Sequence, residues 1–322
     1  MGVWVRAALT AIMLVACGRP DGPGPDQLAD APRTGSSDAP ASTDAPPNVR
    51  DVRVPVPAPS ADYLDLVTPE AVIQPGEEKM LCVHLRNDGG EVAIDNADGR
   101  QGAFGHHIAL FTTDTPEAPG TLEDCTSADA NSHMKWFVFN IAFPAGDAVR
   151  VPAGMPFVLQ FHYINSGEVP ILVRDVERLH LVPVASVTTW ISTLMATAFQ
   201  LAVAPGKTSL TWDCTIPADT QVMQLFGHMH ELGSRYEIDL GADAGSLQPI
   251  YTVDPWMAQY RDSPRVVTYW DAPLHLAAGT IMRTTCEWEN AGATTVIYPA
   301  EMCTTFAFVA SETQYQCEPA SD

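Results

Sequence analysis

The sequence predicts an all-β protein made of two tandem antiparallel β-sandwich domains of the jelly-roll kind. From Asp62 onward, short apolar or alternating runs such as KWFVFNIAF and PFVLQFHYIN are separated by Gly, Pro, Asn and Asp. These runs are rich in β-branched and aromatic residues, which favour strands over helices. One stretch, VASVTTWISTLMATAFQLAVAPGK, could be read as a helix. Because it is rich in Thr and Val and lacks a capping signal, we assign it to strands.

The N-terminus predicts an export signal. MGVWVRAALTAIMLVACGRP contains one arginine, an apolar stretch from Ala7 to Ala16 and then Cys17. The stretch is too short to span a bilayer and fits a signal peptide. LVAC is similar to a bacterial lipobox, whose cysteine is lipidated, although an ordinary signal with a chance cysteine is the alternative. We therefore expect residues 1–17 to be a lipoprotein signal. The protein would then be lipid-anchored in the bacterial cell envelope, at the outer rather than the inner membrane.

Residues 18–61 predict a disordered tether. They are rich in Pro, Ala, Ser and Asp and poor in large apolar side chains. Such a segment cannot bury enough surface to offset its ordering entropy. The folded part is expected to divide into domains at 62–183 and 184–322, because the strand pattern pauses near Pro183.

Charge and cysteine content limit the partners and the compartment. A net charge of -22 argues against binding to nucleic acid or to an anionic membrane surface, and it does not repel metal cations. With Cys17 lipidated, an even number of cysteines remains, which suggests three disulfides in an oxidising compartment, although six cysteines allow about 15 pairings. These cysteines lack the close C-x-x-C spacing of a zinc site: Cys82, Cys125, Cys214, Cys286, Cys303 and Cys317.

Strand alternation singles out some of the nine histidines. In FVLQFHY it places Gln160 and His162 opposite an apolar core face. In VMQLFGHMH it places His228 and His230 side by side with Phe226, a spacing that suits a metal. A lone histidine is usually a surface or hydrogen-bonded core residue, which is the interpretation we give to four others: His84, His133, His180 and His275.

Two further segments carry candidate ligands. In FGHHIALF the adjacent His106 and His107 would point to opposite faces of a regular strand, unless Gly105 permits a bulge. In PAEMCTTFAFV alternation places Met302 on one face and Cys303 on the other. Core filling is the usual role of a methionine, and here it competes with metal binding.

Together these segments resemble a known family. GHHIALF, FVLQFHY, HMHELG and EMC occur in the same order in the copper type II, ascorbate-dependent monooxygenases, which include peptidylglycine alpha-hydroxylating monooxygenase and dopamine beta-monooxygenase. The resemblance covers most of the folded part and implies an interdomain cleft lined by two copper sites. The first site would use three histidines, and the second two histidines and a methionine: His106, His107 and His162, then His228, His230 and Met302.

The resemblance also implies an activity. A monomeric enzyme would hydroxylate a C–H bond of a small substrate with dioxygen and an external reductant such as ascorbate. The second site would handle dioxygen, and Gln160 is a candidate electron route from the first. The disulfides implied by the family are Cys82–Cys125, Cys214–Cys317 and Cys286–Cys303.

The substrate pocket departs from the family pattern. Phe226, Thr304 and Phe306 occupy the positions at which peptidylglycine members hold the substrate carboxylate. Two phenylalanines cannot offset the desolvation of a carboxylate, so an apolar or aromatic substrate is expected, unless these rings only exclude water. The alternative functions are a non-catalytic copper-binding or copper-scavenging lipoprotein and a purely structural β protein. Oxygen uptake with a reductant would separate an enzyme from a copper-binding protein.

Overall fold

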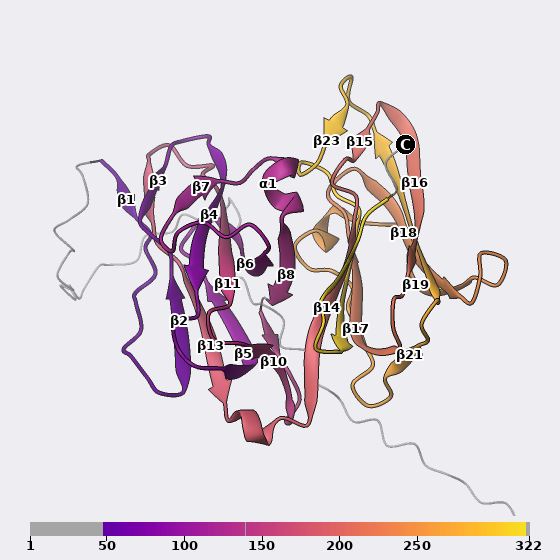
Figure 1. Cartoon of the computed structure of the whole chain (residues 1–322). Helices are drawn as coiled ribbons and strands as arrows, with labels where there is room; N and C mark the ends of the chain where they lie inside the picture. The colour runs from indigo at the N-terminus through magenta and orange to yellow at the C-terminus, as the bar shows by residue number, and fades with distance from the viewer. Residues whose placement is uncertain (1–47, 139, 320–322) are drawn as a thin grey trace, which may run out of the picture. The chain divides into compact units, whose positions relative to one another are not determined.

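The computed structural model describes residues 48–138 and 140–319, which are almost entirely β (Figure 1). The strands form five sheets, and most pairings are antiparallel. A short helix, α1 (Ala128–Ser132), and two 3-10 turns, η1 (Val184–Ser186) and η2 (Ala258–Tyr260), complete the regular structure of these residues. The predicted all-β sandwich class is confirmed.

Five strands form the sheet that carries the first group of histidines. In spatial order they are β7 (Leu122–Asp124), β4 (Glu78–Arg86), β11 (Pro156–Ile164), β6 (Gly105–Thr113) and β8 (Met134–Val138). On the central strand β11, one set of alternate side chains is at most 1% exposed and packs into the main core: Phe157, Leu159, Phe161 and Tyr163. Gln160 and His162 therefore face the other way, as expected.

An eleven-stranded sheet runs through both halves of the folded chain. Its main path is β2 (Tyr63–Val67), β13 (Val176–Val182), β5 (Val92–Arg100), β10 (Asp147–Val151), β14 (Thr189–Thr197), β24 (Thr304–Ala310), β17 (Thr220–His228) and β20 (Val267–Thr268). Three short strands pair alongside: β9 (Ile141–Ala142), β25 (Tyr315–Cys317) and β21 (Leu274–Leu276). The halves meet where β10 pairs with β14. Pro183 lies just before η1, and the division into two domains there stays a prediction.

The other sheets are smaller. A four-stranded sheet contains β16 (Gly206–Thr215), β22 (Ile281–Asn290), β18 (Gly233–Gly241) and β19 (Gln248–Val253). A three-stranded sheet contains β1 (Arg50–Asp51), β12 (Ile171–Val173) and β3 (Ala71–Ile73), and a two-stranded one contains β15 (Ala202–Val203) and β23 (Val296–Ile297). The stretch from Val184 to Lys207 thus forms strands after the η1 turn, as predicted.

Gly227 lets β18 approach β17 just before the second pair of histidines. A Cβ atom at Gly227 would lie 2.2 Å from the Tyr236 ring, so only glycine fits there. The Tyr236 hydroxyl also forms a 2.6 Å hydrogen bond with the hydroxyl of Thr305 on β24. The glycine of FGHMH is therefore explained by packing.

Three disulfides form with the pairing that the family resemblance implies: Cys82–Cys125, Cys214–Cys317 and Cys286–Cys303. Their presence indicates an exported protein, because disulfides persist in oxidising compartments. No helix within the described ranges is both long and apolar enough to cross a membrane.

Part of the predicted tether pairs with another strand. Arg50 and Asp51 form β1 beside β12, and the backbone N–H groups of Val52 and Val54 donate to carbonyls further along the same neighbouring segment at 3.0 and 2.8 Å. The last part of the predicted tether is thus held by another strand, which its own composition does not reveal. The predicted signal peptide, Cys17 and the tether up to residue 47 lie outside the described residues.

Candidate metal centre

A β-bulge brings His106 and His107 to the same site. In the pairing of β6 with β11, His107 lies opposite His162 and Gly105 lies opposite Tyr163, so His106 is the extra residue. A bulge of this kind re-aims side chains that would otherwise point to opposite faces. The bulge expected at Gly105 is present.

The three imidazoles gather at one point. The ring centroids of His106, His107 and His162 lie 4.9 to 5.2 Å apart. One ligating nitrogen of each ring lies within 4.8 Å of the others, and the Nδ1 atoms of His106 and His107 are 2.9 Å apart. Two strands therefore present three nitrogen ligands to a common centre.

The nitrogen on the other side of each ring lies near a side-chain oxygen. His107 Nε2 lies 3.1 Å from Gln160 Oε1, and His162 Nε2 lies 3.0 Å from Glu78 Oε1. His106 Nε2 lies 2.9 Å from Asp262 Oδ1. The first two are hydrogen bonds, whereas the third has ion-pair distance without good hydrogen-bond alignment. A neutral ring that donates through Nε2 carries its lone pair on Nδ1.

The Nδ1 atoms fit a metal ion. Those of His106 and His107 face each other, and that of His162 is buried without a hydrogen-bond partner among the described residues. Converging lone pairs in a buried site repel each other unless a proton or a cation lies between them. Oxygen acceptors behind metal-binding imidazoles are the usual means of orienting such ligands. The residues present therefore suit a divalent transition metal or Cu(I).

Burial keeps these imidazoles neutral at neutral pH. Desolvation, followed by the neighbouring His106 charge, lowers the pKa of His107 to about 4. Desolvation, followed by the charge of His107, lowers the pKa of His162 to about 3. Burial also lowers the pKa of His106, although the Asp262 carboxylate opposes the shift. Neutral imidazole is the form that binds metals, so protons compete only weakly.

A second pair of imidazoles lies at the end of β17. His228 is its last residue and His230 follows in the turn, and their Nε2 atoms are 3.1 Å apart. His230 Nδ1 donates to the carbonyl of Ala300 at 3.1 Å, which leaves its Nε2 with the lone pair. Burial lowers the pKa of His228 well below the usual value. The rings of His228 and His230 thus lie on the same side of the chain, as strand alternation predicts.

Glu301 ties the histidine turn to the methionine segment. Its side chain is 0% exposed. One carboxylate oxygen accepts from the backbone N–H of His230 at 2.6 Å and of Met302 at 3.0 Å, and the other accepts from Leu232 at 3.0 Å. A buried carboxylate is stable only when it is hydrogen-bonded in this way. Glu301 therefore holds the backbones of two candidate ligands together.

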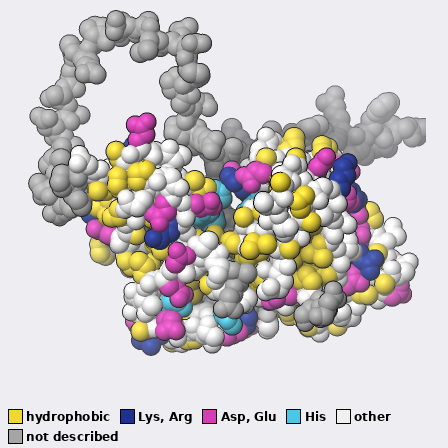
Figure 2. All heavy atoms as spheres, turned by 90° about the horizontal axis from the view of Figure 1, so that it is seen from above, with side chains coloured by type: hydrophobic (Ala, Val, Ile, Leu, Met, Phe, Trp, Pro, Cys, Tyr) yellow, Lys and Arg dark blue, Asp and Glu magenta, His cyan; other side chains and the backbone are white. Residues whose placement is uncertain are grey.

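Both groups of ligands line one cavity of about 710 Å³. Met302, Thr304 and Phe306 also face it, whereas Phe226 is buried behind them, with its ring 5.2 Å from that of Phe306. Trp136 stacks edge-on against Phe306 at 4.8 Å and contributes to the same wall. Figure 2 shows histidine side chains at the surface beside basic and acidic ones. The structure thus brings together every predicted site residue except Phe226, which supports the wall from behind.

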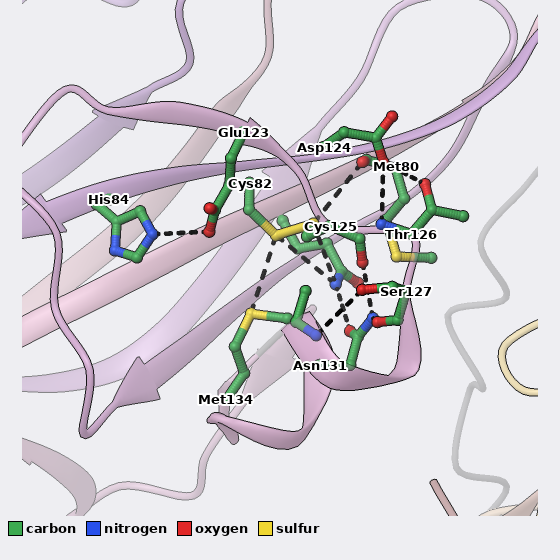
Figure 3. The surroundings of a disulfide bond; sticks show 12 residues. Met80, Cys82, His84, Glu123, Asp124, Cys125, Thr126, Ser127, Asn131 and Met134 are labelled. Carbon is green, nitrogen blue, oxygen red and sulfur yellow. Dashed lines mark hydrogen bonds and ion pairs between the residues drawn. A yellow bond between two sulfur atoms is a disulfide. The ribbon is translucent and has the colours of Figure 1, made fainter. Parts of the chain in front are cut away.

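Gln160 lies between the first histidines and a disulfide. Besides accepting from His107, it donates through Nε2 to Asn131 Oδ1 at 3.0 Å and lies 3.9 Å from both sulfurs of Cys82–Cys125. Asn131 in turn donates to the carbonyl of Cys125 at 2.7 Å (Figure 3). These contacts fix the orientation of the Gln160 amide and hence the His107 tautomer.

The remaining four histidines are either hydrogen-bonded or exposed, as expected. His84 is bonded to Glu123 at 2.9 Å and His180 to Asp95 at 2.5 Å. The other two are exposed: His133 and His275. None of the four lines the cavity.

Sequence reasoning did not identify the oxygen acceptors. Glu78, Asp262 and Glu301 all contact candidate ligands but carry no recognisable spacing relative to them. Glu301 alone had a signal, because it belongs to the EMC segment next to Met302. A single carboxylate beside a ligand does not reveal which backbone groups it will bond.

Comparisons with known proteins give no functional information. Neither a family model nor a curated protein matches the chain. The major capsid protein P2 from bacteriophage PM2 is similar at 8% identity over 78% of this chain and 99% of that one, with a TM-score of 0.33. PNGase F, a glycosylasparaginase from Flavobacterium meningosepticum, is similar at 10% identity over 84% of this chain and 95% of that one, with a TM-score of 0.31. At these TM-scores the similarities carry no argument.

The pKa values predict an unusual proton titration of the metal-free protein. An ordinary histidine titrates near pH 6.5, whereas His107 and His162 gain a proton only near pH 4 and pH 3. Their imidazole NMR signals should therefore stay constant between pH 7 and pH 5.5. A free histidine reference in the same buffer should shift over the same range. Titration of His107 or His162 near pH 6.5 would contradict the buried, neutral site.

Removal of Glu301 should destabilise the second group of ligands. In Glu301→Ala three buried N–H groups lose their acceptor, so we expect the free energy of unfolding to fall by about 3 to 5 kcal/mol. Urea unfolding of the metal-free protein measures this. The control is Glu289→Ala, which removes an exposed carboxylate and should change the value by less than about 0.5 kcal/mol. Equal changes in the free energy of unfolding for the two substitutions would show that the hydrogen bonds of Glu301 do not stabilise the fold.

Proposed function

We propose that the protein is a copper-dependent monooxygenase that hydroxylates a C–H bond of a small apolar or aromatic substrate with dioxygen and an external reductant such as ascorbate. The observation that carries the proposal is the single cavity lined by three imidazoles on one side and by two imidazoles and Met302 on the other. The order of these ligands along the chain is that of the copper type II monooxygenases. Lipid anchorage in the bacterial cell envelope, at the outer membrane, belongs to the same proposal.

The ligand types favour copper over zinc. Imidazoles bind both metals, but a thioether is a soft ligand that favours Cu(I) and is a poor ligand for zinc. His228, His230 and Met302 would hold one copper, and the three histidines of β6 and β11 would hold the other. Copper, when bound, supplies the one-electron redox chemistry and the reaction with dioxygen that C–H hydroxylation requires.

The protein's own residues prepare the cavity for that chemistry. The oxygen atoms behind the histidines favour the tautomers whose ligating nitrogens carry the lone pair and point inward. Phe306 and Trp136 exclude water from the wall beside the second group of ligands. Gln160 is hydrogen-bonded to His107 and faces the cavity, so it is placed to contact a substrate or to assist electron transfer.

The charge of the cavity disfavours an anionic substrate, because Glu78, Glu231 and Asp262 line it. Arg261 is the only Lys or Arg among the described residues that line it. Its guanidinium is already bonded to Glu231 and to Asp262. A substrate carboxylate would have to displace one of these partners to gain a bidentate contact. Apolar and aromatic side chains near Met302 suit an uncharged substrate better.

Oxygen uptake tests the proposal. The purified protein reconstituted with copper should bind two copper ions and consume dioxygen when ascorbate and a suitable apolar or aromatic compound are supplied, with the alcohol as product. Two bound copper ions without oxygen consumption over a broad panel would favour the second candidate, a non-catalytic copper-binding or copper-scavenging lipoprotein. Failure to bind copper would overturn both.

Met302→Ala should separate the two copper sites. Loss of the thioether should weaken Cu(I) binding by the second site and abolish hydroxylation, because the remaining two imidazoles lack the soft ligand. The first site and the melting temperature of the metal-free protein should change little. The control is Met257→Ala, which alters an exposed methionine. Full hydroxylation in Met302→Ala would show that Met302 only fills space.

A further inference from the structure

We infer that Asp262 is a positioning residue of the first metal site, acting through His106 from the other half of the chain. The inference rests on the proposed copper function and adds a residue that lies outside the ligand set. Asp262 follows η2, in the loop between β19 and β20, whereas His106 lies on β6. The first site therefore depends on a loop that is about 150 residues away in the sequence.

The contact is short and has ion-pair distance. Asp262 Oδ1 lies 2.9 Å from His106 Nε2, the nitrogen opposite the one that faces His107. The His106 side chain is 17% exposed, and that of Asp262 is 48% exposed. The carboxylate thus approaches from the solvent side while the ligating nitrogen points inward. The other two rings have Gln160 and Glu78 in the equivalent place.

Arg261 holds the carboxylate in this position. Its Nε donates to Asp262 Oδ1 at 2.9 Å, and its Nη1 donates to Glu231. Glu231 directly follows His230, a candidate ligand of the second site. Asp262, Arg261 and Glu231 thus form a chain of charged groups that runs along the cavity wall from the first site to the second.

A carboxylate behind an imidazole changes the affinity of that imidazole for a metal ion. A negative charge 2.9 Å from Nε2 favours the tautomer that carries its proton there, makes Nδ1 more electron-rich and favours the more highly charged metal ion. Asp262 should therefore stabilise Cu(II) at the first site more than Cu(I). Removing its charge should raise the reduction potential of that site. Loss of an outer-shell partner typically costs about 10- to 100-fold in metal affinity.

The test measures copper at the first site alone. In full-length protein carrying His228→Ala and His230→Ala, chelator competition gives the affinity for Cu(II) and for Cu(I), and electron paramagnetic resonance reports the Cu(II) ligands. Asp262→Asn in this background should weaken Cu(II) binding by about 10- to 100-fold, weaken Cu(I) binding less and alter the Cu(II) spectrum. Asp262→Glu should restore part of the Cu(II) affinity.

The matched control is Asp254→Asn. Asp254 lies in the same loop, its side chain is 60% exposed, and it pairs with Arg235 rather than with a histidine. This variant removes the same charge and should leave copper binding unchanged. Unaltered Cu(II) affinity in Asp262→Asn, or an equal loss in Asp254→Asn, would overturn the inference. Absence of copper binding in the background protein would instead count against the proposed function.

Discussion

The candidate site depends on hydrogen-bond acceptors that lie behind its imidazoles. An imidazole has two nitrogens, and the partner of the outer one decides which lone pair faces the cavity. Three of the five cavity histidines have a hydrogen-bonded partner: Gln160 for His107, Glu78 for His162 and the Ala300 carbonyl for His230. A fourth, His106, has Asp262 at ion-pair distance. Without these oxygens the same rings could rotate or bind a proton on the inner side. The geometry of the candidate ligands therefore rests on residues outside the ligand set.

The β scaffold places those acceptors by pairing strands from distant parts of the chain. Glu78 begins β4 and lies opposite the end of β11, so the register of one strand pair sets its distance from His162. Glu301 precedes β24, which pairs with β17 and so reaches the backbone of the histidine turn. Register is strongly specified where one face is buried, and here the buried face of β11 supplies that specification.

Local pattern predicted the strands, the buried face of β11 and the common side of His228 and His230, because a period of two residues decides which way each side chain points. It also indicated that His106 and His107 could share a site only at a strand end or at a bulge, which Gly105 would permit. Gln160 was located by alternation, but the other oxygen acceptors were out of reach, because tertiary pairing brings them from other strands and loops. Phe226 shows the limit of alternation: it was expected in the pocket wall, yet Phe306 on the neighbouring strand covers it. The pairing of Arg50 and Asp51 with β12 was missed because the partner strand lies far along the chain.

The Cys82–Cys125 disulfide gives the site an order of assembly. Its sulfurs lie against the Gln160 amide, and the carbonyl of Cys125 accepts from the Asn131 amide that orients Gln160. Before oxidation, two thiols would occupy that space, and strand pairing and the Cys125 N–H bond to the Met80 carbonyl would hold Cys125 without a covalent link. The Gln160 amide, and through it the His107 ring, should thus be fully restrained only after the chain has met an oxidant. Metal capture would then follow oxidative folding, which confines a competent centre to the exported protein.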